Sequence, residues 1–293
     1  MTYSIVARDP STGELGVAVQ SHYLGVGAIV SWAEAGVGAV ATQSVADPAY
    51  GPRGLGLMRD GMAAGDALRR LVGADEQPEV RQVAFVDGHG RVAAHTGARC
   101  IAEAGHRLAD GVSAQANIME RATVPGAMVD DYLAEPGDLA ERLLAALDAA
   151  EGEGGDLRGR QSDALVVVAP DATGDLSYDR PFDLRVDDHP DPVGELRRLA
   201  GLRRAFRRIE VADGLAAAGE VEEALAEYAA AHREQPENAE LAFWHGVALA
   251  TARREDEARP LLEEAYRDGE GWRELLSRLP AAGLLPEDHG LLR

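Results

Sequence analysis

Short alternating apolar stretches fill the first half of the chain, and they predict a sheet-rich fold. The β-branched runs Thr2–Arg8 and Leu15–Ser21 flank turn residues at 9–13, which predicts a hairpin. Further strands are expected over 27–32, 37–43, 81–86, 92–96, 112–118 and 164–169, and helices over 51–60, 64–72, 124–133 and 137–150. Because elements of one type cluster rather than alternate, this order favours an α+β fold of packed sheets with segregated helices.

The pattern changes at Asp191, which reads as a helix N-cap before Pro192. Beyond it the chain is rich in Ala, Leu, Glu and Arg and shows no strand signal, which predicts an all-α region. A repeat at an offset of 34 residues, such as Ala224 with Ala258 and Ala231 with Ala265, resembles tetratricopeptide helix pairs. We therefore expect two domains, 1–190 and 191–293, with the second packing on the first, on another copy of the chain or on a protein partner. A homo-oligomer is the expected assembly.

Charge and composition remove several function classes. The 293 residues include 50 acidic and 29 basic side chains, a net charge of −21, and every basic residue is arginine. Without lysine, Schiff-base chemistry, pyridoxal phosphate and Walker-type loops are excluded. The acidity argues against nucleic acids and anionic membranes as partners. The start of the chain lacks signal-peptide features and no apolar stretch is long enough to span a bilayer, so a cytoplasmic protein is expected.

Two features suggest metal or thiol chemistry only weakly. Cys100 is the single cysteine, which excludes an internal disulfide, and it reads as a small buried apolar residue. Residues 187–191 contain three aspartates and His189, and carboxylate and imidazole groups suit a divalent metal. Neighbouring positions in one short loop rarely converge on an ion, so we expect no metal and no cofactor, with metal-dependent hydrolysis as an open alternative.

The start of the chain carries the most informative candidate. Met1 precedes the small residue Thr2, and such initiator methionines are normally removed. Removal would put a hydroxyl and a free α-amine on one residue, and an amine with a pKa of about 8 can act as base towards its own hydroxyl. Two alternatives stay open: Thr2 is an ordinary strand residue, or Ser4, on the same strand face, is the nucleophile.

Several sequence segments resemble a known family, and the resemblance covers residues 1–191. MTYSIVARDPSTGELGVAVQS, GAVATQSVADPAYGPRGL, SAQANIM, GGDLRGRQSDALVVV and DLRVDDHPDP resemble the bacterial family known as domain of unknown function 1028. That family resembles the Ntn-hydrolases, which implies a four-layer αββα sandwich and an N-terminal nucleophile. The resemblance to the proteasome-like branch suggests that Asp156 and Ser162 support Thr2. This chain departs from that branch because it has no lysine beside the nucleophile.

Other polar residues are candidates for the same site. Asn117 ends an apolar strand, where its amide could stabilise an oxyanion. The remaining candidates for binding substrate or supplying positive charge are Arg8, Thr42, Gln43, Tyr50, Arg53, Arg158 and Arg160.

These observations favour an Ntn-type amidohydrolase that cleaves a small amide or peptide-like bond through an acyl-enzyme on Thr2. The competing hypothesis is a non-catalytic binding or scaffold protein, in which the helical repeats recruit a partner. The absence of lysine is the feature that favours the competitor.

Overall fold

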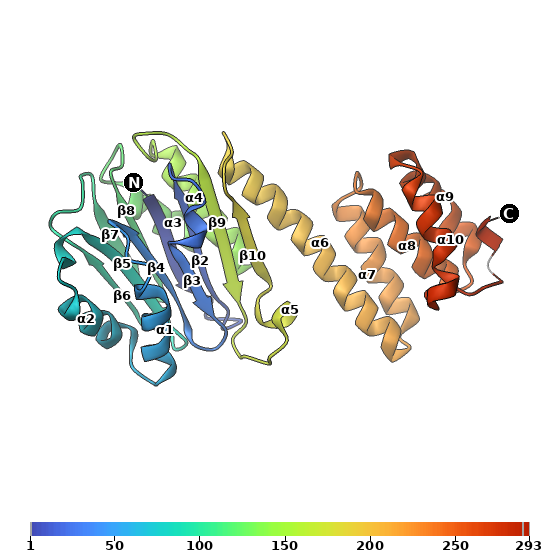
Figure 1. Ribbon diagram of the computed structural model, residues 1–293, viewed down its shortest axis with the longest axis horizontal. Coiled ribbons are helices and arrows are strands. Elements are labelled where there is room, and N and C mark those ends of the chain that lie inside the picture. Colours follow the sequence, from blue (N-terminus) through green and yellow to red (C-terminus); the bar gives the residue numbers. More distant parts are fainter. Residues whose placement is uncertain (1, 289, 293) are drawn as a thin grey trace. The chain divides into compact units, whose positions relative to one another are not determined.

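A computed structural model describes residues 2–288 and 290–292, and the chain divides into two compact units, 1–200 and 201–293. The first unit contains two antiparallel sheets (Figure 1). The six-stranded sheet has the order β10 (Phe182–Val186), β9 (Ser162–Val168), β2 (Leu15–Ser21), β1 (Thr2–Arg8), β8 (Val112–Asn117) and β7 (Gly105–Ala109). The four-stranded sheet has the order β3 (Ser31–Glu34), β4 (Gly38–Ser44), β5 (Arg81–Asp87) and β6 (Val92–Thr96).

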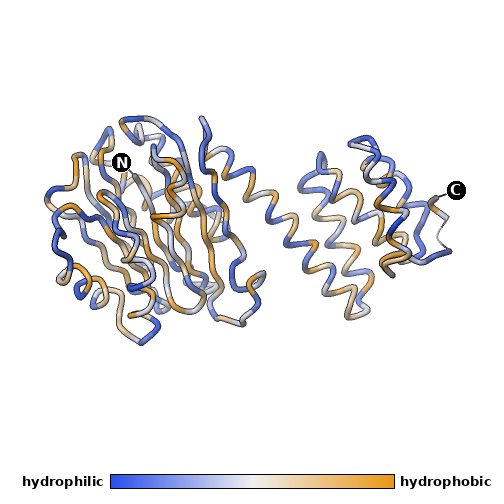
Figure 2. The backbone as a smooth tube through the Cα atoms, in the orientation of Figure 1, coloured by the Kyte–Doolittle hydropathy of each residue, from blue (hydrophilic) through white to orange (hydrophobic). Residues whose placement is uncertain are grey.

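Helices cover the outer face of each sheet, and the alternation of side chains explains why. Helices α1 (Tyr50–Arg59) and α2 (Ala64–Ala74) bury apolar residues against Val40, Val83 and Phe85 of the four-stranded sheet. Helices α3 (Val124–Ala134) and α4 (Leu139–Gly152) pack on the six-stranded sheet. A third apolar cluster lies between the sheets and is built from alternate residues such as Val17 and Ala39. Figure 2 shows hydrophobic residues concentrated along the strands and hydrophilic residues in the loops.

The remaining short elements explain where the sequence pattern was incomplete. Strand β7 was not predicted, because it lies at a sheet edge and its central residues are exposed. Strand β10 was also missed, although Phe182, Leu184 and Val186 do alternate with polar residues. The expected strand over 27–32 begins only at Ser31, since residues 26–28 form a 3-10 helix. Helix α5 (Leu176–Asp179) and the 3-10 helix Pro78–Val80 complete this unit.

The second unit is helical, as predicted. Helix α6 (Pro192–Ala218) begins in the first unit, so the chain divides ten residues after the expected boundary at 190. It is followed by α7 (Val221–Glu234), α8 (Ala239–Thr251), α9 (Glu255–Asp268) and α10 (Gly271–Arg278), with 3-10 helices at Pro280–Ala282 and Gly290–Leu292. The starts of α7 and α9 are 255 − 221 = 34 residues apart, the offset of the sequence repeat. No helix in the described ranges is both long and apolar enough to cross a membrane.

The outer face of the six-stranded sheet buries an uncompensated polar pair near the start of β1. Asp163 lies opposite Gln20 in the β9–β2 register, and both side chains are fully buried. Neither carboxyl oxygen of Asp163 and neither amide atom of Gln20 has a hydrogen-bond partner among the described residues. Burial, followed by the nearby carboxylate of Glu151, raises the pKa of Asp163 well above its usual value. Burial therefore favours the neutral, protonated form of Asp163 in the folded protein.

Replacing this carboxyl with an amide should stabilise the protein at neutral and alkaline pH. Because the pKa of Asp163 is raised on folding, its unfavourable contribution starts above the unfolded-state pKa and grows until the pH reaches the folded-state pKa. Asp163→Asn should therefore gain stability over wild type by up to about 1.4 kcal/mol per pH unit across that window. Urea unfolding between pH 4 and pH 9 measures this difference, and Asp60→Asn, an exposed position, is the control. Equal pH slopes for wild type and Asp163→Asn would contradict the prediction.

Candidate functional site

A row of polar side chains crosses the inner face of the six-stranded sheet at the start of β1. Thr2 lies opposite Asn117 of β8, and Ser21 of β2 lies opposite Ser162 of β9. The hydroxyls of Thr2 and Ser21 are 3.0 Å apart and hydrogen-bonded. Thr2 is 6% exposed, so its side chain is held by the sheet but still reaches the molecular surface. The register thus brings Thr2 together with Asn117 and Ser162, two of its predicted partners.

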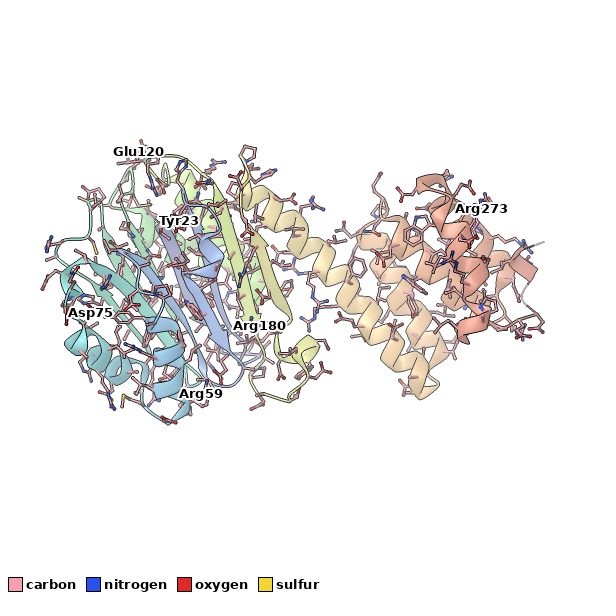
Figure 3. The ribbon with its side chains drawn as sticks, viewed as in Figure 1. Tyr23, Arg59, Asp75, Glu120, Arg180 and Arg273 are labelled. Carbon is pink, nitrogen blue, oxygen red and sulfur yellow. The ribbon has the colours of Figure 1, made fainter. Side chains whose placement is uncertain are left out.

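A cavity of about 370 Å³ opens over Thr2. Thr2, Ser21, Gln43 and Ser44 contribute polar groups to its wall, and Arg158 lies at its edge. The other lining residues are apolar or aromatic: Tyr23, Val26, Ile29, Val30, Ala46 and Pro48. Figure 3 labels Tyr23 at this end of the sandwich. A volume in this range accommodates a small molecule.

The main chain of Thr2 is fixed by amides from both sheets. Its carbonyl oxygen accepts hydrogen bonds from Gln43 Nε2 at 3.1 Å and from Asn117 Nδ2 at 3.4 Å. Gln43 belongs to β4 and Asn117 to β8, so the two donors come from opposite sheets. Gln82 Oε1, on β5, accepts from Gln43 Nε2 at 2.8 Å and from Asn117 Nδ2 at 2.9 Å. Asn117 therefore donates its amide hydrogens to the Thr2 carbonyl oxygen and to Gln82. It does not line the cavity.

A second pair of contacts extends this buried network. Ser4 Oγ donates to Gln43 Oε1 at 2.6 Å and accepts from Gln115 Nε2 at 2.6 Å. Ser4, Gln43 and Gln115 are each at most 1% exposed. Ser4 is thus a hydrogen-bonded core residue in this structure, beneath the cavity rather than in its wall.

Asp156 and Arg158 form an ion pair beside the site. Asp156 Oδ2 is 3.3 Å from Arg158 Nη2, and its Oδ1 accepts from the backbone N–H of Arg158 at 2.8 Å. Asp156 Oδ2 also accepts from the N–H of His22, the residue after Ser21, at 3.2 Å. The pair therefore links the 156–158 loop to the end of β2. Its carboxylate positions Arg158, the member of the pair that reaches the cavity.

Ser162 supports the cavity wall without lining it. Its hydroxyl donates to the carbonyl oxygen of Tyr23 and accepts from the N–H of Val26 at 3.0 Å. Both of these residues line the cavity, so Ser162 sets the path of the 23–26 segment over Thr2.

Five other predicted residues lie elsewhere. The Thr42 hydroxyl donates to the carbonyl oxygen of Asp47 and holds the loop after β4. Tyr50 and Arg53 line a separate cavity of about 440 Å³, where the Tyr50 hydroxyl donates to Asp75 at 3.0 Å. Burial and this carboxylate raise the pKa of Tyr50. Arg160 forms ion pairs with Glu151 and Asp191, and neither it nor Arg8 contributes to the wall of the Thr2 cavity.

The sequence reasoning missed Ser21, Gln82 and Gln115. Gln82 is fully buried within the otherwise apolar run RQVAFV, and Gln115 occupies the same kind of position in SAQAN. A polar amide inside a strand that is buried on both faces was the available signal, because such groups occur only where hydrogen-bond partners exist. Ser21 ends β2 where that strand lies beside the start of β1.

The candidate metal and thiol residues take part in loop contacts. His189 Nδ1 accepts from the N–H of Asp191 at 3.0 Å, and Gln161 Nε2 donates to Asp188 at 3.2 Å. Within residues 2–288 and 290–292, no three His, Cys, Asp or Glu side chains are placed to hold a metal ion. The half-buried Cys100 donates from Sγ to the carbonyl oxygen of Arg81.

Removing Gln82 should test how much the amide network stabilises the two-sheet structure. Gln82→Leu removes the acceptor that Gln43 Nε2 and Asn117 Nδ2 share and the donor to the Ala116 carbonyl oxygen, and each buried hydrogen bond lost costs about 0.5–1.5 kcal/mol. We expect a loss of about 2–5 kcal/mol in the free energy of unfolding. Denaturant unfolding beside the exposed control Gln77→Leu measures it, and equal stability of the two variants would show that the network contributes little.

Comparison with known proteins places this unit in a family. Residues 2–196 match the model described as a family of unknown function (DUF1028). The crystal structure of protein SPO2555 from Silicibacter pomeroyi, assigned to the same family model, is similar, with 34% sequence identity and a TM-score of 0.61. The match covers 68% of this chain and 87% of that one. No curated protein matches. The chain therefore belongs to the DUF1028 family, as its sequence motifs predicted.

Proposed function

We propose that the first unit is an Ntn-type amidohydrolase that cleaves a small amide through an acyl-enzyme on Thr2. One observation carries the proposal: the Thr2 hydroxyl meets that of Ser21 at 3.0 Å in the wall of a cavity of about 370 Å³. Two facing antiparallel sheets, each covered by helices, support the proposal, because the resemblance to Ntn-hydrolases implies a four-layer αββα sandwich.

The reaction needs only groups that the chain supplies. Once Met1 is removed, the neutral α-amine of Thr2 takes the proton of its own hydroxyl, and Oγ1 attacks the carbonyl carbon of the substrate. The tetrahedral intermediate collapses as the C–N bond breaks, and the ammonium group returns the proton to the leaving nitrogen. Water, deprotonated by the same amine, then hydrolyses the Thr2 ester and releases a carboxylic acid. The enzyme returns to its starting state.

The cavity wall contains groups suited to the charges that develop during this reaction. The guanidinium of Arg158 favours the neutral form of a nearby amine, because like charges repel. Ala46 lines the same wall, and its N–H donates to no acceptor within the described part of the chain. We propose this N–H as the donor to the oxyanion, in place of the Asn117 amide, which donates to Thr2 and Gln82.

The second unit supports a non-catalytic competitor. Its helix offset of 34 residues fits tetratricopeptide-like pairs, and it contains an apolar cavity of about 530 Å³ whose wall includes Leu225, Tyr228 and Trp244. In that view the helices recruit a partner and the Thr2 cavity only binds ligand. Acylation of Thr2 by an electrophile distinguishes the two functions, because only the hydrolase forms an ester on this residue.

Thr2 should be acylated by a threonine-directed β-lactone. We expect intact-mass analysis of wild type to show loss of Met1 and addition of one lactone equivalent, with the mass increase located on the N-terminal peptide. Thr2→Ala should abolish labelling, and Thr2→Ser should keep it at a lower rate. Thr123→Ala changes an exposed threonine and is the matched control. Retention of Met1 in labelled protein would contradict the mechanism, and absence of labelling in folded wild type would favour the scaffold.

The cavity predicts which acyl groups react. Its apolar residues suit a short aliphatic acyl group, and Ala46→Leu fills part of that space. We expect Ala46→Leu to lose at least about tenfold in the rate ratio of isovaleryl over acetyl substrates, since one methylene in a tight pocket is worth about 10–200-fold. Rates of acylation by p-nitrophenyl esters measure this ratio. Ala98→Leu, at an exposed position, should leave it unchanged. An unchanged ratio in Ala46→Leu would refute this placement of the acyl group.

A further inference from the structure

Another cavity lies at the far end of the space between the sheets. Arg8 shares the inner face of β1 with Thr2 and lies six residues away, about 20 Å along an extended strand. The cavity measures about 540 Å³, and Arg8, Ser11, Met58 and His89 are among its lining residues. Two labelled residues in Figure 3 mark the opposite ends of the first unit. Tyr23 lines the Thr2 cavity, and Arg59 follows Met58, which lines this one.

The guanidinium of Arg8 has no counter-ion among residues 2–288 and 290–292. Its Nε is buried without an acceptor, and no carboxylate of the described residues lies within 4.0 Å of its nitrogens. The other arginine of this cavity, Arg91, is paired with Asp87 at 2.8 Å. Asp87 also accepts from the N–H groups of Ala64 and His89, both at 3.0 Å. The charge of Asp87 is therefore already compensated, and that of Arg8 is not.

Glycines at the surrounding turns leave room beside Arg8. A Cβ at Gly13 would lie 3.2 Å from Arg8 Nη2 and 2.9 Å from Pro170 Cβ. Gly13 also has φ of +80°, where side chains are strained. A Cβ at Gly88 would lie 2.8 Å from the carbonyl oxygen of Gly36, so the loops of two hairpins approach closely here. Because Gly13 has no side chain, the space beside the guanidinium of Arg8 stays open.

We propose that Arg8 anchors a small carboxylate or phosphate anion in this cavity, at a site separate from that of Thr2. A partly buried cation without a counter-ion costs free energy, and a bound anion removes that cost. The planar fork of a guanidinium matches carboxylate and phosphate oxygens in pairs. The cavity has the size of a small-molecule site.

Titration of the full chain with inorganic phosphate and with succinate tests the proposal. We expect at least one probe to bind wild type in calorimetry and to raise its thermal midpoint with concentration. Arg8→Gln should weaken binding at least about tenfold, because a charge-assisted hydrogen-bond pair is lost. Thr2→Ala should bind as wild type, which separates this site from the proposed catalytic one. Arg59→Gln, an exposed arginine at the same end of the unit, is the charge-matched control.

The outcomes are distinct. Tighter binding of phosphate than of succinate identifies a phosphate ligand, and the reverse identifies a carboxylate. If Arg8→Gln fails to fold, Arg8→Lys, which keeps the charge and loses the fork, should fold and bind more weakly than wild type. The proposal is overturned if neither probe binds wild type at up to about 10 mM, a concentration above the Kd of even weak specific sites. It is also overturned if folded Arg8 variants bind as tightly as wild type, or if Thr2→Ala abolishes binding.

Discussion

The hydrogen bonds that Gln43 and Asn117 donate to the carbonyl oxygen of Thr2 are the constraint on which the site depends. Their shared acceptor, Gln82, joins the four-stranded sheet to the six-stranded one at this end. Elsewhere the sheets meet through apolar contacts, which are not directional and permit sliding. Directional amide bonds fix the register between the sheets where Thr2 must face the cavity.

The network also explains how polar residues are tolerated inside a sandwich. Gln82 uses its amide hydrogens on Ala116, Gly105 and Thr96, so its donors are paired within the protein. The cost of burying an amide is largely offset when both of its ends are bonded. Gln20 and Asp163, on the opposite face of the same sheet, lack such partners. On the face towards Thr2 the amides of Gln43, Gln82 and Gln115 are hydrogen-bonded, whereas among the described residues Gln20 and Asp163 on the other face find no partner.

Much of this fold could be predicted from alternation, because β1 and β2 begin and end where the pattern of apolar residues does. The edge strand β7 could not, since its pairing with β8 does not require a buried face. The candidate site was harder. Alternation places Thr2 and Arg8 on one face of β1, but only the position of the loops shows that they serve different cavities. Likewise Ser162 was identified by resemblance, while its contacts with the 23–26 segment depend on tertiary structure.

The absence of lysine is consistent with the neutral side chains that surround the start of β1. The interior below Thr2 is built from the neutral side chains of Gln43, Gln82, Gln115 and Asn117. A lysine there would need a buried counter-charge, whereas amides supply donors without adding a charge to desolvate. Cations remain only at the edge, where Arg158 is already paired with Asp156. Neutral amides lie below Thr2 and Arg158 is paired with Asp156, so the described residues around Thr2 supply hydrogen bonds without a buried lysine charge.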